Sequence, residues 1–376
     1  MRFLLRERES LESLLPGLDK QLAAVPLLDL ETTQGTALKA FTLAGGPGLL
    51  VPAVHGGAGA DLLSAVRVQR ALGSRSPALA VATTMHHFST ATLAEAASAG
   101  EGMEWLLLAA IAEGNLLLAS GFAEGRTGQG ILHPALTARM DGDQVRLSGS
   151  KKPCSLARSM KLLTASFMLP GPDGSWELAI ALVPADAPGV SVRPFWRAPV
   201  LAAAESEEVV LDDVAVPAEL LVRTGVTDEG RADHLQTVGF VWFELLMTAS
   251  YLGAASAMVE RTLADTRVDP SVRGEAIIAV EAAMLSVEGL ASAIGRRPPG
   301  EEALAQSLIC RYAAQDAISR TLALCMEALG GMAFIASGEL AYLQSACRAL
   351  AFHPPSKSRT AAPLTDYFAG RPLLIP

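Results

Sequence analysis

The spacing of hydrophobic residues changes twice along the chain, and it predicts helices, then strands, then helices. Apolar residues recur at helical spacing over 62–72 and again over 91–110. Apolar and polar residues then alternate, as at 144–148 and 207–211, which is typical of half-buried strands. Helical spacing returns in a long apolar segment over 240–262. We therefore expect an α+β protein in which strands stand between two groups of helices.

Turn signals divide this pattern into three predicted domains. Residues 1–113 would form an N-terminal helical domain, residues 114–226 a β-domain, and residues 227–376 a C-terminal helical domain. A chain of 376 residues is long enough for two or three domains, because a domain typically has about 100–200 residues.

Composition limits the kinds of partner. The net charge is −9 and there is no long basic run, so nucleic acid is not expected as a partner. The N-terminus is too charged for a signal peptide, and the most apolar run, 105–123, is interrupted at 113–115, which argues against a membrane span. The four cysteines form no C-x-x-C pair, which is typical of reduced thiols. We expect a cytoplasmic protein without a metal site or a membrane partner.

Five short motifs occur in a fixed order along the chain. They are V-P-A-V-H-G-G-A-G at 51–59, A-E-G-R-T-G-Q-G at 123–130, S-G-S-K-K-P-C-S at 148–155, E-V-V-L-D-D-V-A-V-P at 208–217 and L-G-G at 329–331. In this order and spacing they resemble the motifs of the acyl-CoA dehydrogenase family. Each motif is weak alone, but the set covers most of the chain, so the chain is identified as a divergent member.

The resemblance implies both a fold and an activity. The fold would be an N-terminal helical domain, a central antiparallel β-barrel or sandwich, and a C-terminal four-helix bundle. The implied activity is oxidation of the Cα–Cβ bond of an acyl thioester, carried by coenzyme A or by a carrier protein. A carboxylate removes the α-proton in this family and FAD accepts the β-hydride. The resemblance also implies a homodimer or homotetramer, in which paired C-terminal domains complete the FAD sites.

The resemblance assigns cofactor contacts residue by residue. The backbone of Phe122 and Ala123 would meet the flavin, and the hydroxyl of Ser155 would take the place of a threonine hydroxyl in the family. The remaining residues would lie near the phosphates or across a subunit interface. The full set is Phe122, Ala123, Gln129, Ser155, Arg267, Gly330 and Gly331. Pro153 stands where an aromatic residue usually packs on the flavin, and Glu327 stands where the family has glutamine. A carboxylate near a pyrophosphate is unfavourable, so FAD binding is expected to be weakened.

The catalytic base is the largest departure from the family. Counting from Arg348, the position of the usual catalytic Glu falls on Pro354, which cannot accept a proton. Three residues are candidates to replace it, of which Glu124, at the position of a structural Glu of the family, is the weakest. Glu244 lies in an apolar helix, one residue, or about 100° of rotation, beyond the alternative position of the family's base. His353 is adjacent to the lost base and would be neutral at pH 7. The neighbouring pair His86 and His87 is a weaker candidate near the substrate region.

Two other functions are compatible with these substitutions. The chain could be a catalytically silent subunit of a heteromeric acyl-CoA dehydrogenase, since such subunits lack the base and part of the FAD site. It could instead be a flavin monooxygenase on the same scaffold, because that chemistry does not need the carboxylate. The motifs predict a flavoprotein, and the substitutions leave the reaction open among these three.

Overall fold

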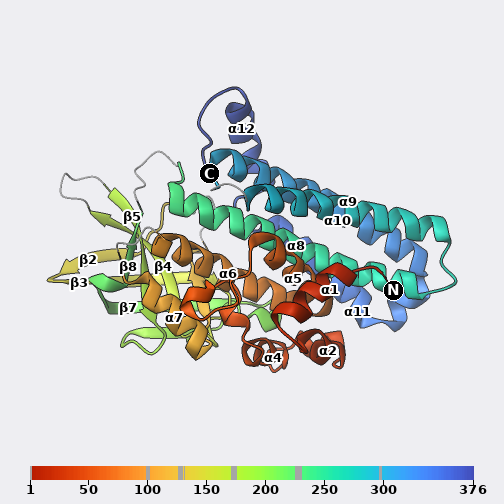
Figure 1. The fold of residues 1–376 in the computed structure, drawn as a ribbon, viewed down its shortest axis with the longest axis horizontal. Helices are drawn as coiled ribbons and strands as arrows, with labels where there is room; N and C mark the ends of the chain where they lie inside the picture. The colour runs from red at the N-terminus through yellow and green to blue at the C-terminus, as the bar shows by residue number, and fades with distance from the viewer. Residues whose placement is uncertain are drawn as a thin grey trace.

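The computed structural model describes residues 2–98, 102–125, 130, 132–170, 176–224, 231–295 and 299–376. Strands lie at one end of the molecule and long helices form the remainder (Figure 1). The predicted α+β fold class, with helices on either side of the strands in sequence, is confirmed.

Short and medium helices precede the first strand. They are α1 (Leu5–Leu14), α2 (Leu18–Ala23), α3 (Leu27–Leu30), α4 (Ala37–Leu43), α5 (Leu62–Arg75), α6 (Pro77–Ser98) and α7 (Glu104–Gly114). Asp61 caps α5, because its Oδ1 accepts a hydrogen bond from the N–H of Ser64 at 2.7 Å. The apolar spacing over 91–110 suggested one helix, whereas α6 ends at Ser98 and α7 begins at Glu104.

The strands in the described ranges form two four-stranded sheets. One has the order β1 (Leu118–Gly121), β4 (Leu162–Pro170), β5 (Trp176–Pro184) and β8 (Leu221–Arg223); the other has the order β2 (Thr137–Asp141), β3 (Gln144–Cys154), β7 (Glu207–Pro217) and β6 (Val190–Arg193). Val145 and Leu147 on β3 are fully buried, as the alternation predicts. The described pairings are antiparallel except that of β1 with β4, which is parallel.

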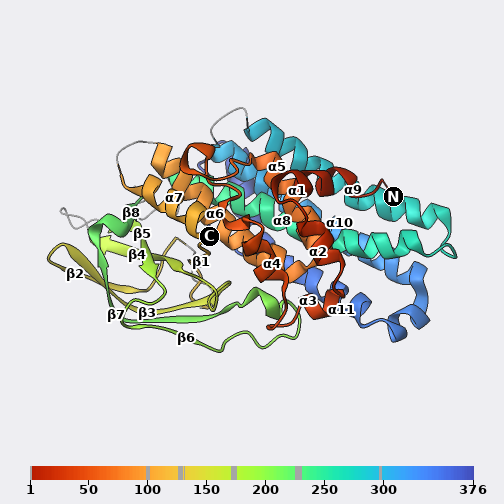
Figure 2. The same cartoon turned by 60° about the horizontal axis from the view of Figure 1, so that its bottom comes forward.

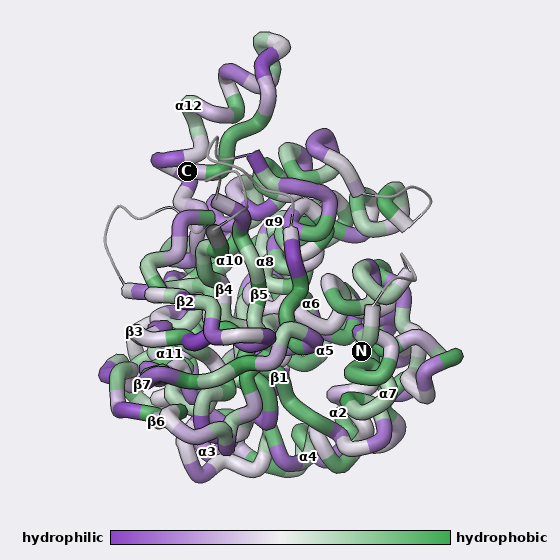
Figure 3. The backbone as a smooth tube through the Cα atoms, turned by 90° about the vertical axis from the view of Figure 1, so that its left-hand side faces the viewer, coloured by the Kyte–Doolittle hydropathy of each residue, from purple (hydrophilic) through white to green (hydrophobic). Residues whose placement is uncertain are grey.

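The C-terminal part consists of long helices. They are α8 (His234–Ala264), α9 (Pro270–Ile294), α10 (Glu301–Ala336), α11 (Gly338–Cys347) and α12 (Lys357–Phe368). The first four pack against one another, whereas α12 stands away from them (Figure 3). Helix α6 contacts both β1 and α8, so it lies between the strands and the C-terminal helices (Figure 2). These contacts bring the three parts of the chain together around α6.

Helix α5 crosses α8 at two glycines. A Cβ added at Gly73 would lie 2.1 Å from the carbonyl oxygen of Ser250, and one at Gly253 would lie 2.3 Å from that of Arg70. Beside the crossing, the buried Arg70 binds Glu7 of α1 at 2.6 Å, and it also contacts Glu281 of α9. The crossing therefore fixes α8 against the N-terminal helices at close range.

Three helices, α8, α9 and α10, are long and apolar enough to cross a membrane by length and composition alone. For α8, 89% of the apolar window is buried inside the protein, so its apolar surface is used in the fold. The corresponding values are 33% for α9 and 22% for α10. These two helices therefore keep apolar faces on the outside of the chain. Nothing in the described structure shows what covers these faces, so the expectation of no membrane partner stays a prediction.

Candidate active site

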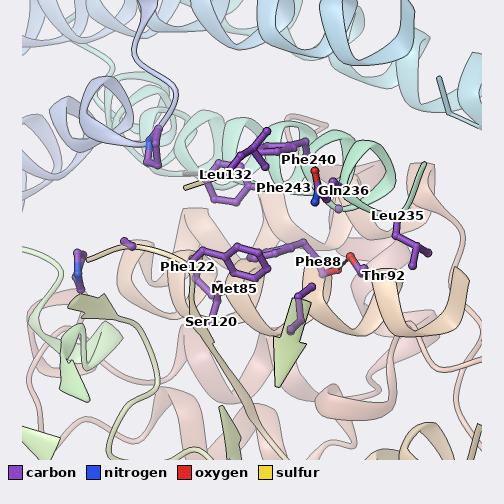
Figure 4. A pocket seen from close by; sticks show the side chains of 15 residues that line it. Met85, Phe88, Thr92, Ser120, Phe122, Leu132, Leu235, Gln236, Phe240 and Phe243 are labelled. Carbon is purple, nitrogen blue, oxygen red and sulfur yellow. Dashed lines mark hydrogen bonds between the residues drawn. The ribbon is translucent and has the colours of Figure 1, made fainter. Parts of the chain in front are cut away.

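A cavity lies where α6, α8 and the end of β1 meet. It encloses about 700 Å³, including the part open to solvent. Figure 4 shows Phe88 and Thr92 rising from α6 on one side, and Phe240 and Phe243 descending from α8 on the other. Every part of the chain contributes to the wall, so the cavity forms only when the parts have docked.

Aromatic rings make up much of the wall. The Phe88 ring lies 6.0 Å from that of Phe122, at the end of β1, and 5.6 Å from that of Phe243, which it meets edge to face. Such offset contacts stabilise aromatic clusters beyond the burial of their area. Among the cavity-lining residues in the described ranges, none has an ionisable side chain. A ligand here is therefore surrounded by apolar surface and uncharged dipoles.

Two polar side chains in the wall end in atoms without a hydrogen-bond partner in the described structure. They are Ser120, whose Oγ is buried at the end of β1, and Gln236, whose Oε1 is buried in the first turn of α8. Thr92 also lines the cavity, but its hydroxyl donates to the carbonyl of Phe88 at 2.9 Å. Buried polar atoms in native proteins normally have partners, so Ser120 and Gln236 mark where a ligand would bind.

Pro354 forms part of the cavity wall. The sequence count placed the family's usual catalytic Glu at this position, and the structure shows that the position faces the cavity. The backbone here is held by Arg311, which donates to the carbonyl oxygen of Pro354 at 3.3 Å and also to that of Pro355. Arg311 thus fixes a proline, which cannot ionise, at this point of the wall.

Glu244 does not line the cavity. It is fully buried on α8, and its Oε2 lies 2.9 Å from Nε of Arg311 on α10. The contact is mainly Coulombic, because the Nε–H bond is not directed at the carboxylate. Burial raises the pKa of Glu244 to about 7, and the charge of Arg311 opposes this shift. The structure therefore places Glu244 in an ion pair between helices, behind the residues that line the cavity.

His353 lies beside the cavity wall without lining it. Its Nε2 is 2.9 Å from the hydroxyl of Tyr251, and its ring meets Phe243 edge to face at 6.0 Å. Burial, and then the positive charge of Arg311, lower the pKa of His353 below its usual value. The ring is therefore neutral at pH 7 and a weak proton acceptor.

The histidine pair on α6 is buried in the helical core. Nδ1 of His86 accepts the N–H of Leu118 at 3.1 Å, and its Nε2 lies 2.9 Å from the carbonyl oxygen of Pro47. Burial lowers the pKa of His86 to about 4 and that of His87 well below its usual value. His86 therefore fastens β1 and the loop at Pro47 to α6, which positions the end of β1 at the cavity.

No family model matches the chain. Isobutylamine N-hydroxylase of Streptomyces viridifaciens is 48% identical over 378 residues, which cover 100% of both proteins. Acyl-CoA dehydrogenase FadE12 of Mycobacterium bovis is 25% identical and covers 82% of this chain and 81% of that protein. The chain belongs to the acyl-CoA dehydrogenase-like family. The resemblance predicted from the five motifs is thereby confirmed.

A solved structure supports the same fold. The X-ray structure of KijD3 in complex with FMN and dTDP-3-amino-2,3,6-trideoxy-4-keto-3-methyl-D-glucose superimposes with a TM-score of 0.84 at 21% identity, over 97% of this chain and 94% of that chain. At 21% identity, this similarity shows that the two chains share the fold of the acyl-CoA dehydrogenase-like family, and it shows nothing about their reactions.

The expected cofactor residues of this family member lie in different places. Phe122 and Ala123 line the cavity, and Ala123 is held in place because its carbonyl oxygen accepts the N–H of Lys152 at 2.8 Å. Ser155 is nearly buried, and its Oγ lies 2.9 Å from that of Ser206. Pro153, at the position of the family's aromatic residue, forms part of the cavity wall. Phe122, Ala123 and Pro153 are therefore brought together in the cavity wall.

The remaining predicted contacts are not brought to the cavity. Arg267 is exposed in the turn between α8 and α9, and it pairs with Asp265 at 2.7 Å. Gly330, with a φ of 78°, makes a kink in α10, and Gly331 follows it in open space. Gln129 lies outside the described residues. The resemblance placed Arg267 in a segment that reaches FAD across a subunit interface, and the roles of Arg267, Gly330 and Gly331 stay predictions.

Sequence reasoning missed Ser120 and Gln236. The only signal for Gln236 was the spacing Asp233-x-x-Gln236 at the start of an apolar helix, which is typical of a capping box. Asp233 does cap α8, because its Oδ1 accepts the N–H of Gln236 at 2.7 Å. The Gln236 side chain instead donates to the hydroxyl of Thr224, which follows β8 and precedes Gln236 by 12 positions. That partner could not be found from local spacing.

Proposed function

We propose that the chain is a flavin-dependent monooxygenase that hydroxylates the nitrogen of a small primary amine. The overall reaction would convert the amine, dioxygen and a reduced flavin into an N-hydroxylamine, water and an oxidised flavin. The proposal is supported by the full-length similarity to isobutylamine N-hydroxylase. The observation that carries it is the apolar cavity, in which no described lining residue is ionisable and Pro354 stands where the sequence count placed the family's catalytic Glu.

An uncharged cavity favours this reaction for a physical reason. The nitrogen can react as a nucleophile only through its lone pair, whereas a free alkylamine in water at pH 7 is mostly protonated. Transfer into apolar surroundings disfavours the charged form and lowers the pKa of the ammonium group. A carboxylate in the wall would have the opposite effect, because it would stabilise the ammonium ion. A proline in place of the family's Glu therefore favours amine oxidation. It also removes the base that would take a proton from a thioester.

The cavity wall also carries groups that suit a flavin. The aromatic rings of Phe88 and Phe122 offer flat apolar surface, the segment Phe122–Ala123 offers a fixed backbone, and Ser120 offers a buried oxygen that lacks a partner in the described structure. When bound, a reduced flavin would supply two electrons and react with dioxygen. The residues of the chain would bind the amine beside it, exclude water and keep the nitrogen unprotonated. The family resemblance predicts FAD, while FMN is the form bound in KijD3, so both forms need to be tested.

Thioester oxidation is less well supported by this site. Of the candidate bases, Glu244 forms an ion pair with Arg311 and does not line the cavity. His353 is a neutral ring that is hydrogen-bonded to Tyr251. The silent-subunit hypothesis is also less well supported, because the chain is similar to isobutylamine N-hydroxylase over the full length of both proteins.

The test is a pair of assays on the same purified protein. In the first, the protein receives isobutylamine, dioxygen and chemically reduced FMN or FAD; we expect an N-hydroxylamine. In the second, it receives isobutyryl-CoA and an artificial electron acceptor without oxygen; we expect no unsaturated thioester. Thioester oxidation without amine hydroxylation would overturn the proposal. Activity that appears only after a related second chain is added would favour the silent subunit.

We also propose that the protein assembles with copies of itself through α9 and α10. Ile278 and Leu285 on α9 are 68% and 57% exposed, and seven residues apart they share a helix face. Met332 near the end of α10 is 76% exposed. Large apolar patches on a helix surface usually mark contacts with another molecule. A second copy is the occupant that the family resemblance implies.

A further inference from the structure

Gln236 places a buried acceptor in the wall of the cavity. Its side chain is 6% exposed, and Oε1 has no hydrogen-bond partner in the part of the chain that the structure describes. Figure 4 shows Gln236 on α8, close to Phe240 and Phe243. A buried acceptor without a partner destabilises a folded protein, so such an atom needs a functional explanation. The explanation here is a donor that arrives with the ligand.

A chain of hydrogen bonds fixes which end of the amide is the acceptor. The hydroxyl of Thr224 donates its only proton to the carbonyl oxygen of Leu178 at 2.6 Å. Its oxygen can then only accept from Gln236, whose Nε2 lies 2.9 Å away. The nitrogen end of the amide is thus held by Thr224, and the oxygen end is left for the ligand. The backbone of Gln236 is fixed as well, because its N–H donates to the cap residue Asp233.

We propose that Gln236 is the residue that binds the substrate nitrogen, and that Thr224 is the positioning residue that orients it. The inference rests on the proposed amine hydroxylation. Oε1 would accept one N–H of a neutral primary amine, which leaves the lone pair free to react. The alkyl group would then occupy the apolar part of the cavity beside Phe88 and Phe243.

An amide suits this task better than a carboxylate. Its oxygen carries only a partial negative charge, so it accepts a hydrogen bond without strongly stabilising the ammonium ion. A carboxylate at the same place would raise the pKa of the bound amine. Gln236 therefore recognises a nitrogen donor and still permits the deprotonated form that the reaction needs.

Gln236→Leu tests the acceptor directly. The variant keeps the approximate size of the side chain but cannot accept an N–H. We expect the KM for isobutylamine to rise by about tenfold, with a smaller change in kcat, as for the loss of one hydrogen bond to a buried partner. Calorimetric titration of isobutylamine into the flavin-loaded protein should show the same loss of affinity. Gln21→Leu, the same change on the exposed face of α2, is the matched control and should leave both values unaltered.

Gln236→Glu provides a second readout that a merely structural role would not change. We expect kcat at pH 7 to fall and the pH profile of kcat to move to higher pH, because the carboxylate holds the amine protonated. Thr224→Val should weaken amine binding, since the amide is then free to turn, and Thr224→Ser should restore it by keeping the hydroxyl.

The outcomes separate this inference from the proposed function. If the unaltered protein hydroxylates isobutylamine while Gln236→Leu has the same KM and the same calorimetric affinity, Gln236 does not bind the nitrogen and the inference is wrong. An unmoved pH profile in Gln236→Glu would also contradict it. If the unaltered protein hydroxylates no amine at all, the proposed function itself is wrong.

Discussion

Pro354 is the residue on which the proposed change in chemistry depends most. It lines the cavity at the position where the sequence count placed the family's base, and its loop is anchored by Arg311. Because proline neither ionises nor donates from its nitrogen, the wall stays uncharged here. An amine bound nearby would therefore lose its proton more readily than in water.

Restoring a carboxylate at this position should impair amine hydroxylation. We expect Pro354→Glu to hydroxylate isobutylamine at least about tenfold more slowly at pH 7 than Pro354→Gln, because a nearby carboxylate raises the pKa of a cation by about 1–3 units. Steady-state rates of N-hydroxylamine formation for the two variants provide the measurement. Pro354→Gln is the matched control, since it loses the same proline ring without gaining charge. Equal rates would show that charge in the wall does not matter.

His86 makes part of the stability depend on pH. Its pKa is about 4 in the folded protein because the ring is buried, against an ordinary value of 6.5. The unfolded chain therefore binds a proton first, and the stabilisation is present above pH 6.5 and lost as the pH falls toward 4. Between pH 7 and pH 5 this group should account for about 2 kcal/mol of lost stability.

Urea unfolding of the protein and of His86→Gln at pH 7 and pH 5 measures this contribution. The variant should be less stable at pH 7, because it loses the contacts to Leu118 and Pro47. Its further loss on going to pH 5 should be smaller than that of the unaltered protein by about 2 kcal/mol. An identical loss in both proteins would mean that His86 does not stay neutral in the fold.

The sequence predicted some individual residues and not their partners. The count from Arg348 placed the family's base at Pro354, and this residue does line the cavity, while its equivalence to the base stays a prediction. Glu244 was recognised as an acid in an apolar helix, but its partner Arg311 lies 67 positions later on another helix. Gln236 and Thr224 meet only after α8 has packed beside β8. Contacts of this kind depend on docking, and a single sequence does not encode them in any local pattern.

At the level of elements, the crossing of α5 and α8 depends on Gly73 and Gly253. Neither position has room for a Cβ beside the facing backbone. A wider crossing would shift α8, which carries Gln236, Phe240 and Phe243 into the cavity. The substrate site therefore depends on a contact that lies outside it.

Gly253→Ala should destabilise the protein. The added methyl group would meet the backbone oxygen of Arg70 at 2.3 Å, and overpacking of this kind costs about 1–3 kcal/mol. Gly289→Ala on the exposed side of α9 is the control; it has open space and should stabilise by about 0.5–1 kcal/mol through helix propensity. Thermal or urea unfolding compares the two. Equal stability of both variants would show that the helices can separate without penalty.

Elements were predicted well where their pattern is local. The alternation in β3 and the long apolar helix α8 were both found, although α8 begins six residues earlier than the apolar run suggested, at His234. The parallel pairing of β1 with β4 was not found, because hydrophobic alternation does not specify the direction of a partner strand. The division after Ser98 was missed, although Gly100 and Gly102 interrupt the apolar pattern there.

For the whole molecule, the proposed assembly through α9 makes a direct prediction. The double variant Ile278→Glu/Leu285→Glu should be smaller in solution than the unaltered protein, because four-carbon apolar side chains at a contact are replaced by charges. Light scattering coupled to size-exclusion chromatography gives the mass. Leu43→Glu, at a residue of α4 that is 77% exposed, is the control and should not alter the mass. A monomeric unaltered protein would contradict the proposal.

The order of the parts could be predicted from the sequence, while the reaction could not. Five motifs identified the family, and the missing base raised three alternatives without choosing among them. The choice depends on how the walls of one cavity come together, with Pro354, Ser120 and Gln236 supplied by distant segments. The physical character of that space, apolar and without charge among the residues described, is a property of the folded molecule.

The most direct test of this account is the origin of the oxygen in the product. The protein is incubated with isobutylamine, a reduced flavin and dioxygen labelled with the heavy isotope, and the products are examined by mass spectrometry. The account predicts N-isobutylhydroxylamine that carries one labelled oxygen atom. Unchanged amine in this assay, together with an unsaturated acyl thioester when isobutyryl-CoA is supplied, would contradict it.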